Sequence, residues 1–287
     1  MVSPAKAHSK PRNLRDALKE TLTPAEMKKL VTSFDIIGDI AIIDIPDELK
    51  GKEKQIGEAL LRVHKSIKTV CKRSGIHEGA YRVRHVEFIA GDRRTETVHR
   101  ESGVAMGLDV DNVYFTPRLS HERERIAALV KPGETIGAFF AGVGPFPLVI
   151  AKKHPDTTIY AIELNPAAFE YLKHNVNVNG AGGSIVPVLG DVREIAPAAL
   201  KGKCDRILMP LPKGGEDFLD IAFACAKKNC IIHFYQFSKE EDPYSAAIAR
   251  VDEAAKKAGR RIEIENKKIV RPFAPRVNQI VLDIRVK

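Results

Sequence analysis

The hydrophobic positions after about residue 114 alternate between short apolar runs and segments with helical spacing. The apolar runs predict strands at 135–141, 158–163, 184–189, 205–211 and 229–236. The segments with helical spacing predict helices at 119–130, 146–154, 166–177, 193–200, 215–227 and 243–258. The last two stretches, 261–270 and 277–286, predict a closing pair of strands. Five β–α units and a closing hairpin predict an α/β fold with a doubly wound sheet and an antiparallel edge.

The preceding part of the chain has a different pattern, which predicts a small α+β module. A polar start leads into an amphipathic helix, for which Thr23 supplies an N-cap and Pro24 a first-turn proline. The elements predicted next are a strand or hairpin at 33–46, a helix at 57–73, a strand at 81–91 and two short strands within 96–110. The expected organisation is an N-terminal polar and helical extension (1–30), a small α+β domain (31–113) and an α/β domain (114–287).

The composition indicates a globular protein without a membrane anchor. Hydrophobic residues make up 44% of the 287, and charges interrupt every apolar run before it reaches the length of a membrane span. The basic first residues lack an apolar stretch, so we expect no signal peptide and a cytoplasmic location. The four cysteines (71, 204, 225 and 230) show neither C-x-x-C pairs nor a disulfide framework, which favours reduced thiols over structural zinc.

Net charge adds information about partners. Lys and Arg number 46 against 37 Asp and Glu, and this net charge of +9 permits a polyanionic partner. The excess is strongest at 62–84, where seven basic residues accompany one acid, Glu78; a solvated helix face explains this stretch equally well. The absence of Trp and the 6% of aromatic residues argue against a base-stacking platform for single strands.

Candidate chemistry lies at the carboxyl ends of three predicted strands. The turn FAGVGPF (140–146) has Gly142 and Gly144, which permit a tight turn and a close approach of ligand to backbone. Glu163 ends the next strand, where a carboxylate can accept hydrogen bonds from both ribose hydroxyls. Asp191 follows the third strand and is well placed to meet an adenine amine. Each feature alone also suits an ordinary loop, but together they predict an adenosyl ligand.

NAD and S-adenosylmethionine both contain an adenosyl group. The turn lacks the third glycine of G-x-G-x-x-G, and Pro145 removes an amide donor that a pyrophosphate would use. The closing antiparallel pair of strands also favours a methyltransferase-like sheet. The sequence therefore favours S-adenosylmethionine over NAD.

The loop after the fourth strand, MPLPKGGEDFLD (209–220), lies beside this predicted crevice. In many methyltransferases that act on exocyclic amines, an Asn or Asp at this place accepts a hydrogen bond from the amine. Pro210 has neither an amide donor nor a side-chain acceptor and cannot take that role. A rigid loop without chemistry is the alternative for Pro-Leu-Pro.

A series of motifs gives the chain a family resemblance. SFDIIGDIAII, TETVHRESG, VYFTPRLSHER, FAGVGPF, ELNP, GDVRE and PLPKGGEDFLD occur in this order from about residue 33. They resemble the archaeal tRNA (guanine-N1)-methyltransferases that modify position 37. The resemblance implies a small α+β RNA-binding domain before a class I (Rossmann-like) methyltransferase domain. It also implies a tRNA with a purine at position 37 as partner; no obligate protein partner is evident, and we expect a monomer.

Departures from the family pattern refine this expectation. Pro210-Leu211-Pro212 stands where most members have Asn-Leu-Pro, and ELNP (163–166) where most have Asp-Ile-Asn-Pro. Both resemble the subfamily that is bifunctional in wyosine synthesis and methylates N1 of guanosine and later C7 of 4-demethylwyosine. Ala138 replaces an Asp that usually precedes the glycine turn, a change expected to weaken or reshape the methionine end of the site.

By resemblance, Glu122 in SHERER is the general base and Arg82 in YRVR stabilises the oxygen at guanine C6. Guanine N1 becomes a good nucleophile only as its proton leaves, so a carboxylate within reach and a cation near O6 suit the reaction. The alternatives are a helix-surface pair of Glu122 with Arg125 and a phosphate contact for Arg82. The motif context favours the catalytic roles.

The resemblance also implies the residues that contact cofactor and RNA. The cofactor residues are Tyr114, Phe140, Gly142, Gly144, Glu163, Leu164, Asn165, Asp191, Val192, Pro210 and Pro212, with Arg123 as a weaker member. The RNA residues are Arg100, Arg118, His121 and Lys213. No acidic or histidine cluster has the spacing of metal ligands, so we expect metal-independent transfer.

Three other functions compete with this interpretation. A related wyosine enzyme transfers the aminocarboxypropyl group of S-adenosylmethionine; Glu122 and the Leu-Pro loop favour methyl transfer instead. A tRNA-binding protein that has lost catalysis is suggested by Ala138 and Pro210. A generic dinucleotide enzyme is disfavoured by the missing third glycine.

Overall fold

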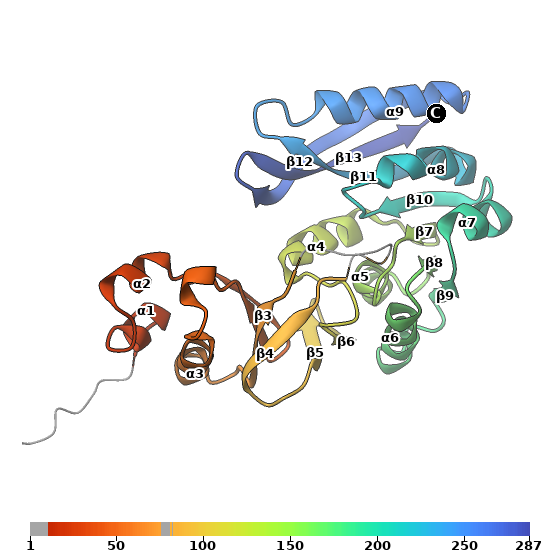
Figure 1. Cartoon of the computed structure of the whole chain (residues 1–287). Coiled ribbons are helices and arrows are strands. Elements are labelled where there is room, and N and C mark those ends of the chain that lie inside the picture. Colours follow the sequence, from red (N-terminus) through yellow and green to blue (C-terminus); the bar gives the residue numbers. More distant parts are fainter. Residues whose placement is uncertain (1–10, 76–80, 82) are drawn as a thin grey trace, which may run out of the picture. The chain divides into compact units, whose positions relative to one another are not determined.

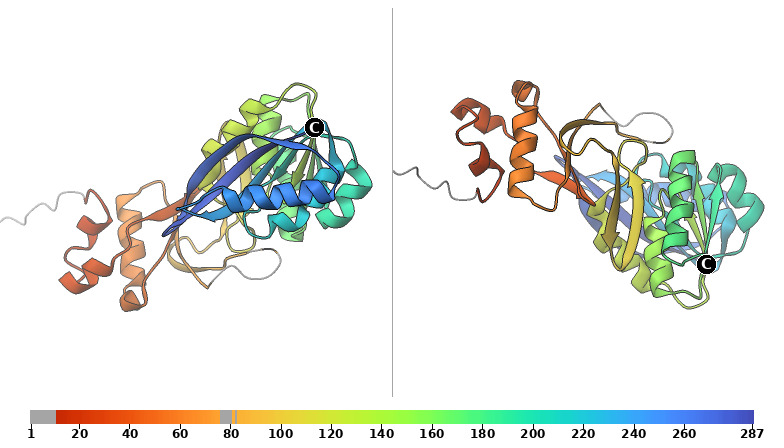
Figure 2. Two further views of the ribbon diagram at one scale, coloured as in Figure 1. Left: turned by 90° about the horizontal axis from the view of Figure 1, so that it is seen from above. Right: turned by 90° about the horizontal axis from the view of Figure 1, so that it is seen from below.

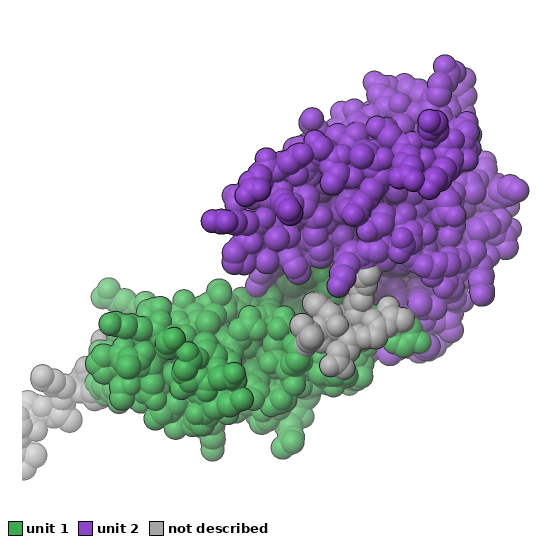
Figure 3. Space-filling model, turned by 45° about the horizontal axis from the view of Figure 1, so that its top comes forward, with its two compact units in different colours: residues 1–99, 108–117 green, residues 100–107, 118–287 purple. Residues whose placement is uncertain are grey.

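The computed structural model describes residues 11–75, 81 and 83–287, which form two compact units (Figure 3). Unit 1 comprises the described residues up to 99 together with 108–117, and unit 2 comprises 100–107 and 118–287. The division passes through strands β5 (Glu96–Glu101) and β6 (Val104–Asp109), so the turn between them groups with unit 2. Each unit has its own hydrophobic core.

Unit 1 begins with the short helices α1 (Leu14–Leu18) and α2 (Pro24–Lys29). Thr23 caps α2 as expected: the backbone N–H of Glu26 donates to its hydroxyl at 3.3 Å, and the Glu26 carboxylate accepts the Thr23 N–H at 2.7 Å. Leu14 and Leu18 are buried in the core of this unit. Helix α1 thus contributes to the core of unit 1.

The sheet of unit 1 has the order β1-β2-β3-β4, and its parts include one helix that the sequence predicted wrongly. The strands are β1 (Phe34–Ile37), β2 (Ile40–Ile43), β3 (Thr69–Arg73) and β4 (Val86–Gly91), with the short helix η1 (Asp47–Leu49) after β2. Helix α3 (Glu53–Val63) ends ten residues before the predicted end at 73. The missing part is β3, which pairs with both β2 and β4, and this pairing outweighs the helical spacing of its apolar residues.

The position of β3 also changes the interpretation of the basic stretch at 62–84. Lys72 lies on this strand and contacts Glu53 and Glu87, each at 2.9 Å. Its neighbour Arg73 pairs with Asp35 and with Asp44, the latter at 2.6 Å. A solvated helix face is therefore wrong for these two residues, since they lie on a strand and carboxylates from other elements pair with them.

Unit 2 contains a seven-stranded sheet of order β12-β13-β11-β10-β7-β8-β9 (Figure 1). Its strands are β7 (Thr135–Phe139), β8 (Thr158–Glu163), β9 (Ile185–Leu189), β10 (Cys204–Met209), β11 (Ala226–Lys239), β12 (Ile262–Ala274) and β13 (Val277–Val286). The strands from β11 to β9 are parallel, whereas β13 is antiparallel to both β11 and β12. This confirms the doubly wound sheet with an antiparallel edge.

Helices cover both faces of this sheet (Figure 2). They are α4 (Ser120–Leu129), α5 (Pro145–Lys153), α6 (Pro166–Val178), α7 (Val192–Leu200), α8 (Leu219–Cys225) and α9 (Ser245–Lys257), with the short helices η2 (Pro117–Leu119) and η3 (Gly215–Phe218). Helices α7, α8 and α9 pack over one core, and α4 packs beside α5. Because the strand order reverses between β7 and β10, a ligand crevice is expected where the carboxyl ends of these strands diverge.

One predicted helix of unit 2 is shorter than expected. The segment 215–227 forms η3 and α8, and β11 already begins at Ala226.

The four cysteines are buried free thiols, and burial raises the pKa of Cys71 to about 11. No helix among the described residues is long and apolar enough to cross a membrane.

Candidate active site

The turn between β7 and α5 has a backbone conformation that few residues adopt. Phe140, Gly142 and Gly144 have positive φ angles of 57°, 57° and 92°. A Cβ atom on Gly144 would lie 2.7 Å from Cδ1 of Leu172, so this position has no space for a side chain. Pro145 occupies the first turn of α5, where its missing N–H is not needed. The tight turn expected from the glycines is therefore present.

Glu163 joins this turn to the end of β8. Its Oε2 accepts the Gly142 N–H at 2.7 Å, and its Oε1 accepts the Asn165 N–H at 2.7 Å. Burial raises the pKa of Glu163, and its hydrogen bonds from backbone N–H groups oppose that shift. Because each carboxylate oxygen has a further lone pair, the group can also accept hydrogen bonds from ligand hydroxyls. The carboxylate thus lies at the strand end predicted to hold a ribose.

Asn165 and Asp191 cap the helices that follow β8 and β9. Asn165 Oδ1 accepts the Ala167 N–H at 3.0 Å, and Asp191 Oδ1 accepts the Arg193 N–H at 2.8 Å. Leu164 lies between Glu163 and Asn165 in the sequence, and its side chain is 40% exposed. Strands β7, β8 and β9 are adjacent and parallel, so these residues lie along one edge of the sheet.

Phe140 and Phe218 form an aromatic contact at the same edge, and the sequence did not predict this contact. The Phe140 ring packs edge-on against Phe218, with 4.8 Å between the ring centroids. The Arg193 guanidinium lies 4.1 Å from the Phe218 ring centroid and 3.3 Å from Asp191. This places one cation between the aromatic ring and the carboxylate proposed for adenine.

The Pro210–Pro212 loop continues the edge after β10. The Leu211 N–H donates to Met209 O at 2.8 Å, and the Phe237 N–H donates to Pro212 O at 3.0 Å. These bonds fix the loop against β11. Pro210 and Pro212 are half-buried, whereas Val192 at the start of α7 is buried.

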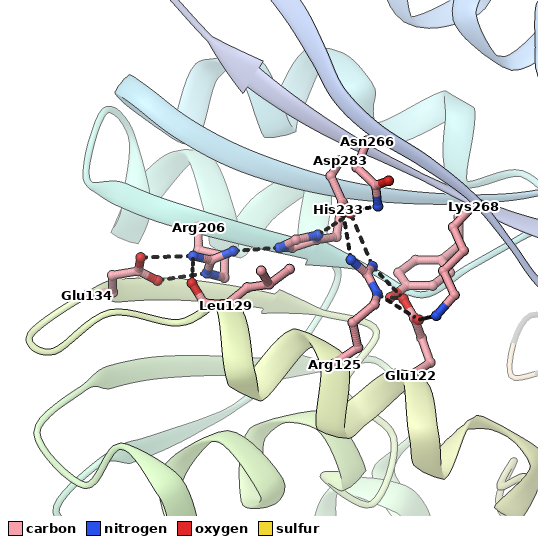
Figure 4. Close-up of polar contacts among 10 residues, drawn as sticks. Glu122, Arg125, Leu129, Glu134, Arg206, His233, Asn266, Lys268 and Asp283 are labelled. Carbon is pink, nitrogen blue, oxygen red and sulfur yellow. Dashed lines mark hydrogen bonds and ion pairs between the residues drawn. The ribbon is translucent and has the colours of Figure 1, made fainter.

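Glu122 lies on α4 and is only 3% exposed (Figure 4). Arg125 donates to its two carboxylate oxygens at 2.7 and 2.9 Å, and the Tyr235 hydroxyl donates to Oε1 at 2.7 Å. Lys268 Nζ lies 3.7 Å from Oε2. The i,i+3 pair of Glu122 with Arg125 therefore forms, but Glu122 is buried and Arg125 is half-buried, so the pair does not lie on an exposed helix surface.

Glu122 is connected to the glycine turn through Tyr235 and Phe146. The Tyr235 ring packs against Phe146, with 6.1 Å between the ring centroids. Phe146 directly follows Pro145 in the first turn of α5. Thus the hydroxyl of Tyr235 contacts the expected base, and its ring contacts the helix that begins at the expected cofactor site.

The other expected site residues have different surroundings. Arg123, the weaker cofactor candidate, is 1% exposed and pairs with Glu101 through two hydrogen bonds, one of which measures 2.6 Å. Tyr114 lies in unit 1 and is 45% exposed. Arg82 lies outside the described residues. The expected RNA residues all belong to unit 2 and are exposed: Arg100, Arg118, His121 and Lys213.

Asn175 supports the glycine turn and was missed by the sequence interpretation. Its Nδ2 donates to Val143 O and to Gly107 O at 3.0 Å each, and its Oδ1 accepts the Gly107 N–H at 2.7 Å. The signal was a polar residue beside Val176 on the buried face of α6. His233 on β11 contacts Arg206 and Asp283, and these contacts are described below. Within the described part of the chain, no group of three His, Cys, Asp or Glu side chains is arranged to hold a metal ion.

Comparisons with known proteins agree with this geometry. The sequence matches the TRM5/TYW2 methyltransferase domain over residues 97–265 and the TYW2 N-terminal domain over 14–95. The tRNA (guanine(37)-N(1))-methyltransferase Trm5b of Pyrococcus abyssi is 45% identical over 92% of this chain and 78% of its own. The crystal structure of Trm5b from that organism has a TM-score of 0.85, covering 93% of this chain and 79% of its own at 44% identity.

Other relatives carry out different reactions. The tRNA (guanine(37)-N(1))/4-demethylwyosine(37)-methyltransferase Taw22 of Nanoarchaeum equitans is 34% identical over 73% of this chain and 85% of its own. A tRNA(Phe) (4-demethylwyosine(37)-C(7)) aminocarboxypropyltransferase of Pyrococcus horikoshii is 31% identical over 96% of this chain and 97% of its own.

A cofactor complex is known for a further relative. The structure of M. jannaschii TYW2 in complex with AdoMet is 26% identical, with a TM-score of 0.70 over 89% of this chain and 99% of that one. Together with the domain matches, these similarities extend over both units. The chain belongs to the TRM5/TYW2 methyltransferase family.

Proposed function

We propose that this protein transfers the methyl group of S-adenosylmethionine to N1 of guanosine at tRNA position 37, and also methylates C7 of 4-demethylwyosine at that position. The observation that carries the proposal is the buried carboxylate of Glu122, which Arg125 and Tyr235 hold beside the helix of the glycine turn. A fixed carboxylate next to a methyl-donor site has the placement required to deprotonate a weakly acidic ring nitrogen. The similarity to Trm5b supports the same reaction on the same nucleobase, guanine at position 37.

The cofactor residues follow from the edge formed by β7, β8 and β9. Glu163 would accept hydrogen bonds from the ribose hydroxyls, and Asp191 would meet the adenine amine. The bound sulfonium supplies an activated methyl group, so the protein mainly positions and deprotonates. The remaining proposed contacts are Tyr114, Phe140, Gly142, Gly144, Leu164, Asn165, Val192, Pro210 and Pro212.

Glu122 and Arg82 would share the chemistry at the base. Glu122 would take the proton from guanine N1, and the hydrogen bonds from Arg125 and Tyr235 hold its carboxylate in place. Arg82 would offset the negative charge that develops on O6. Arg100, Arg118, His121 and Lys213 would bind the tRNA, through phosphates in the case of the three cations. We further propose that the chain acts as a monomer in the cytoplasm, with 31–113 contacting tRNA and 114–287 carrying out transfer.

The second methylation is supported by the Pro210 loop and the ELNP motif, both of which resemble the bifunctional subfamily. The relative Taw22, which is 34% identical to this chain, carries both reactions in its name. Aminocarboxypropyl transfer is the alternative, because a relative with that activity matches almost the whole chain. The presence of Glu122, buried and held by Arg125 and Tyr235, favours methyl transfer.

The experiment uses the full chain, labelled S-adenosylmethionine and a tRNA transcript with guanosine at position 37, followed by nucleoside mass analysis. We expect 1-methylguanosine, and we expect Glu122→Gln to slow its formation by about 100-fold or more. Binding of S-adenosylhomocysteine should be unchanged in that variant. A second substrate, tRNA that carries 4-demethylwyosine, should gain one methyl group. A gain of aminocarboxypropyl together with release of methylthioadenosine would refute the proposal, as would 1-methylguanosine formation that does not need Glu122.

A further inference from the structure

A continuous series of charged side chains extends from Glu122 into the interior of unit 2 (Figure 4). Arg125 bridges two carboxylates: it donates to Glu122, and it donates to Asp283 on β13 at 2.7 and 3.2 Å. Asp283 Oδ1 lies 2.6 Å from Nδ1 of His233 on β11. His233 Nε2 lies 2.7 Å from Arg206, a residue of β10.

The series ends at the start of β7. Arg206 donates to both oxygens of Glu134, at 2.7 and 2.9 Å, and to Leu129 O at 2.7 Å. Leu129 is the last residue of α4, the helix that also carries Glu122. The interactions therefore connect α4 with β10, β11 and β13, and return to α4.

These contacts determine the tautomer of His233. An arginine has N–H donors and no acceptor, so Nε2 of His233 must accept from Arg206. The ring proton is consequently on Nδ1 and is donated to Asp283. Burial lowers the pKa of His233, which agrees with a neutral ring. Asp283 is the ionised member: burial opposes its charge, but bonds from His233 and Arg125 outweigh burial and hold its pKa far below the ordinary value.

The charges around Glu122 are balanced. The carboxylates are Glu122, Asp283 and Glu134, and the cations are Arg125, Arg206 and Lys268, with His233 and Tyr235 neutral. Arg125 therefore divides its positive charge between two carboxylates. A base held by Arg125 alone would be a weaker base, because an undivided cation stabilises the ionised form more strongly.

We propose that Asp283 and His233 are positioning residues for Glu122, which orient Arg125 and share its charge so that the general base is both fixed and sufficiently basic. Asp283 fixes the far side of the guanidinium, and His233 fixes Asp283. Neither residue contacts substrate or cofactor in this scheme. The inference rests on the proposed role of Glu122 in methyl transfer.

The test compares Asp283→Asn with the wild type in single-turnover methyl transfer across pH, with rates expressed per S-adenosylhomocysteine-binding site. Without the Asp283 charge, Arg125 has Glu122 as its single carboxylate partner, so the acid limb of the pH profile should move to lower pH. The plateau rate should fall several-fold, because Arg125 is then less well oriented and Glu122 is the weaker base. The KM for tRNA should stay unchanged. A purely structural role would reduce the number of binding sites without moving the acid limb.

Two further variants keep the result decisive. Asp205→Asn is the matched control: this carboxylate on β10 pairs with Lys227 at 2.8 Å and does not belong to the Glu122 series, so its pH profile should match the wild type. His233→Ala should slow transfer at unchanged KM, and His233→Asn should restore the rate because its amide can donate to Asp283 in place of Nδ1.

The outcomes separate this inference from the proposed function. If Glu122→Gln abolishes transfer while Asp283→Asn keeps the wild-type acid limb and rate, the positioning role is refuted and the base assignment stands. If Asp283→Asn does not fold, equal rates for the two His233 variants would refute the role. If Glu122→Gln transfers methyl normally, the proposed base itself is wrong.

Discussion

The proposed site has two sides, the ends of β7, β8 and β9 and the surroundings of Glu122, and different kinds of interaction hold them in place. At the ends of β7, β8 and β9, the backbone supplies most of the structure: glycines shape the turn, and Glu163, Asn165 and Asp191 accept N–H groups within their own or neighbouring turns. Around Glu122, side chains from α4, β11 and β12 meet through their charges and hydroxyls. The first side follows from local sequence, and the second depends on tertiary packing.

This difference explains why the two sides should respond differently to mutation. A carboxylate that bonds to backbone N–H groups mainly fixes geometry for a ligand, so its loss should appear in affinity. A carboxylate held by an arginine and a tyrosine has its basicity set by those neighbours, so their loss should appear in rate and pH dependence. The predictions below test this separation.

The largest effect on cofactor affinity is expected for Glu163→Ala. The change removes the acceptor proposed for the ribose and also the partner of the Gly142 and Asn165 N–H groups. Because hydrogen bonds to a charged group contribute about 1.5–3 kcal/mol, affinity for S-adenosylhomocysteine should fall about 10- to 100-fold. Calorimetry measures the loss, with Glu170→Ala on the exposed part of α6 as the control. Unchanged affinity would remove Glu163 from the cofactor site.

A smaller effect, on the rate and its pH dependence and not on cofactor affinity, is expected for Tyr235→Phe. The variant keeps the ring that packs on Phe146 and removes the hydroxyl that donates to Glu122. A hydrogen bond to a charged carboxylate contributes at least about 1.5 kcal/mol, so transfer near the acid limb should slow about tenfold. The base loses a donor that favours its ionised form, so the acid limb should move up in pH, opposite to Asp283→Asn. A pH–rate profile measures the shift, and a limb that moves down would contradict this account.

The same contrast explains how much the sequence predicted. The order of the β–α units and the strand-end positions of Glu163 and Asp191 followed from hydrophobic periods and turn residues, which act over a few positions. The prediction of a helix over 57–73 was wrong beyond residue 63, because the pairing of β3 with β2 and β4 depends on residues far away in the sequence. Of the residues around Glu122, the sequence indicated only Arg125, because an i,i+3 pair is local. Asp283 is 161 positions from Glu122, and neither it nor His233 lies in a motif that points to α4.

Acid unfolding provides the last test, with opposite signs for the two sides. The pKa of Asp283 is depressed in the folded state, so its contribution to stability is present above the unfolded value of 3.8 and is lost as pH falls through the folded value. Wild type should thus lose about 1 kcal/mol through this group by pH 3, a loss that Asp283→Asn lacks.

Glu163 has a raised pKa, so its contribution has the other sign: it is fully present below the unfolded value of 4.5 and is lost as pH rises through the folded value. Glu163→Gln should therefore lose stability more steeply than wild type on acidification, whereas Asp283→Asn should lose it less steeply. Urea unfolding at pH 7, 5, 4 and 3, read as the free energy of unfolding, measures both slopes. Slopes that change in the same direction would show that the two carboxylates do not differ in this way, because only opposite pKa shifts produce opposite pH dependence.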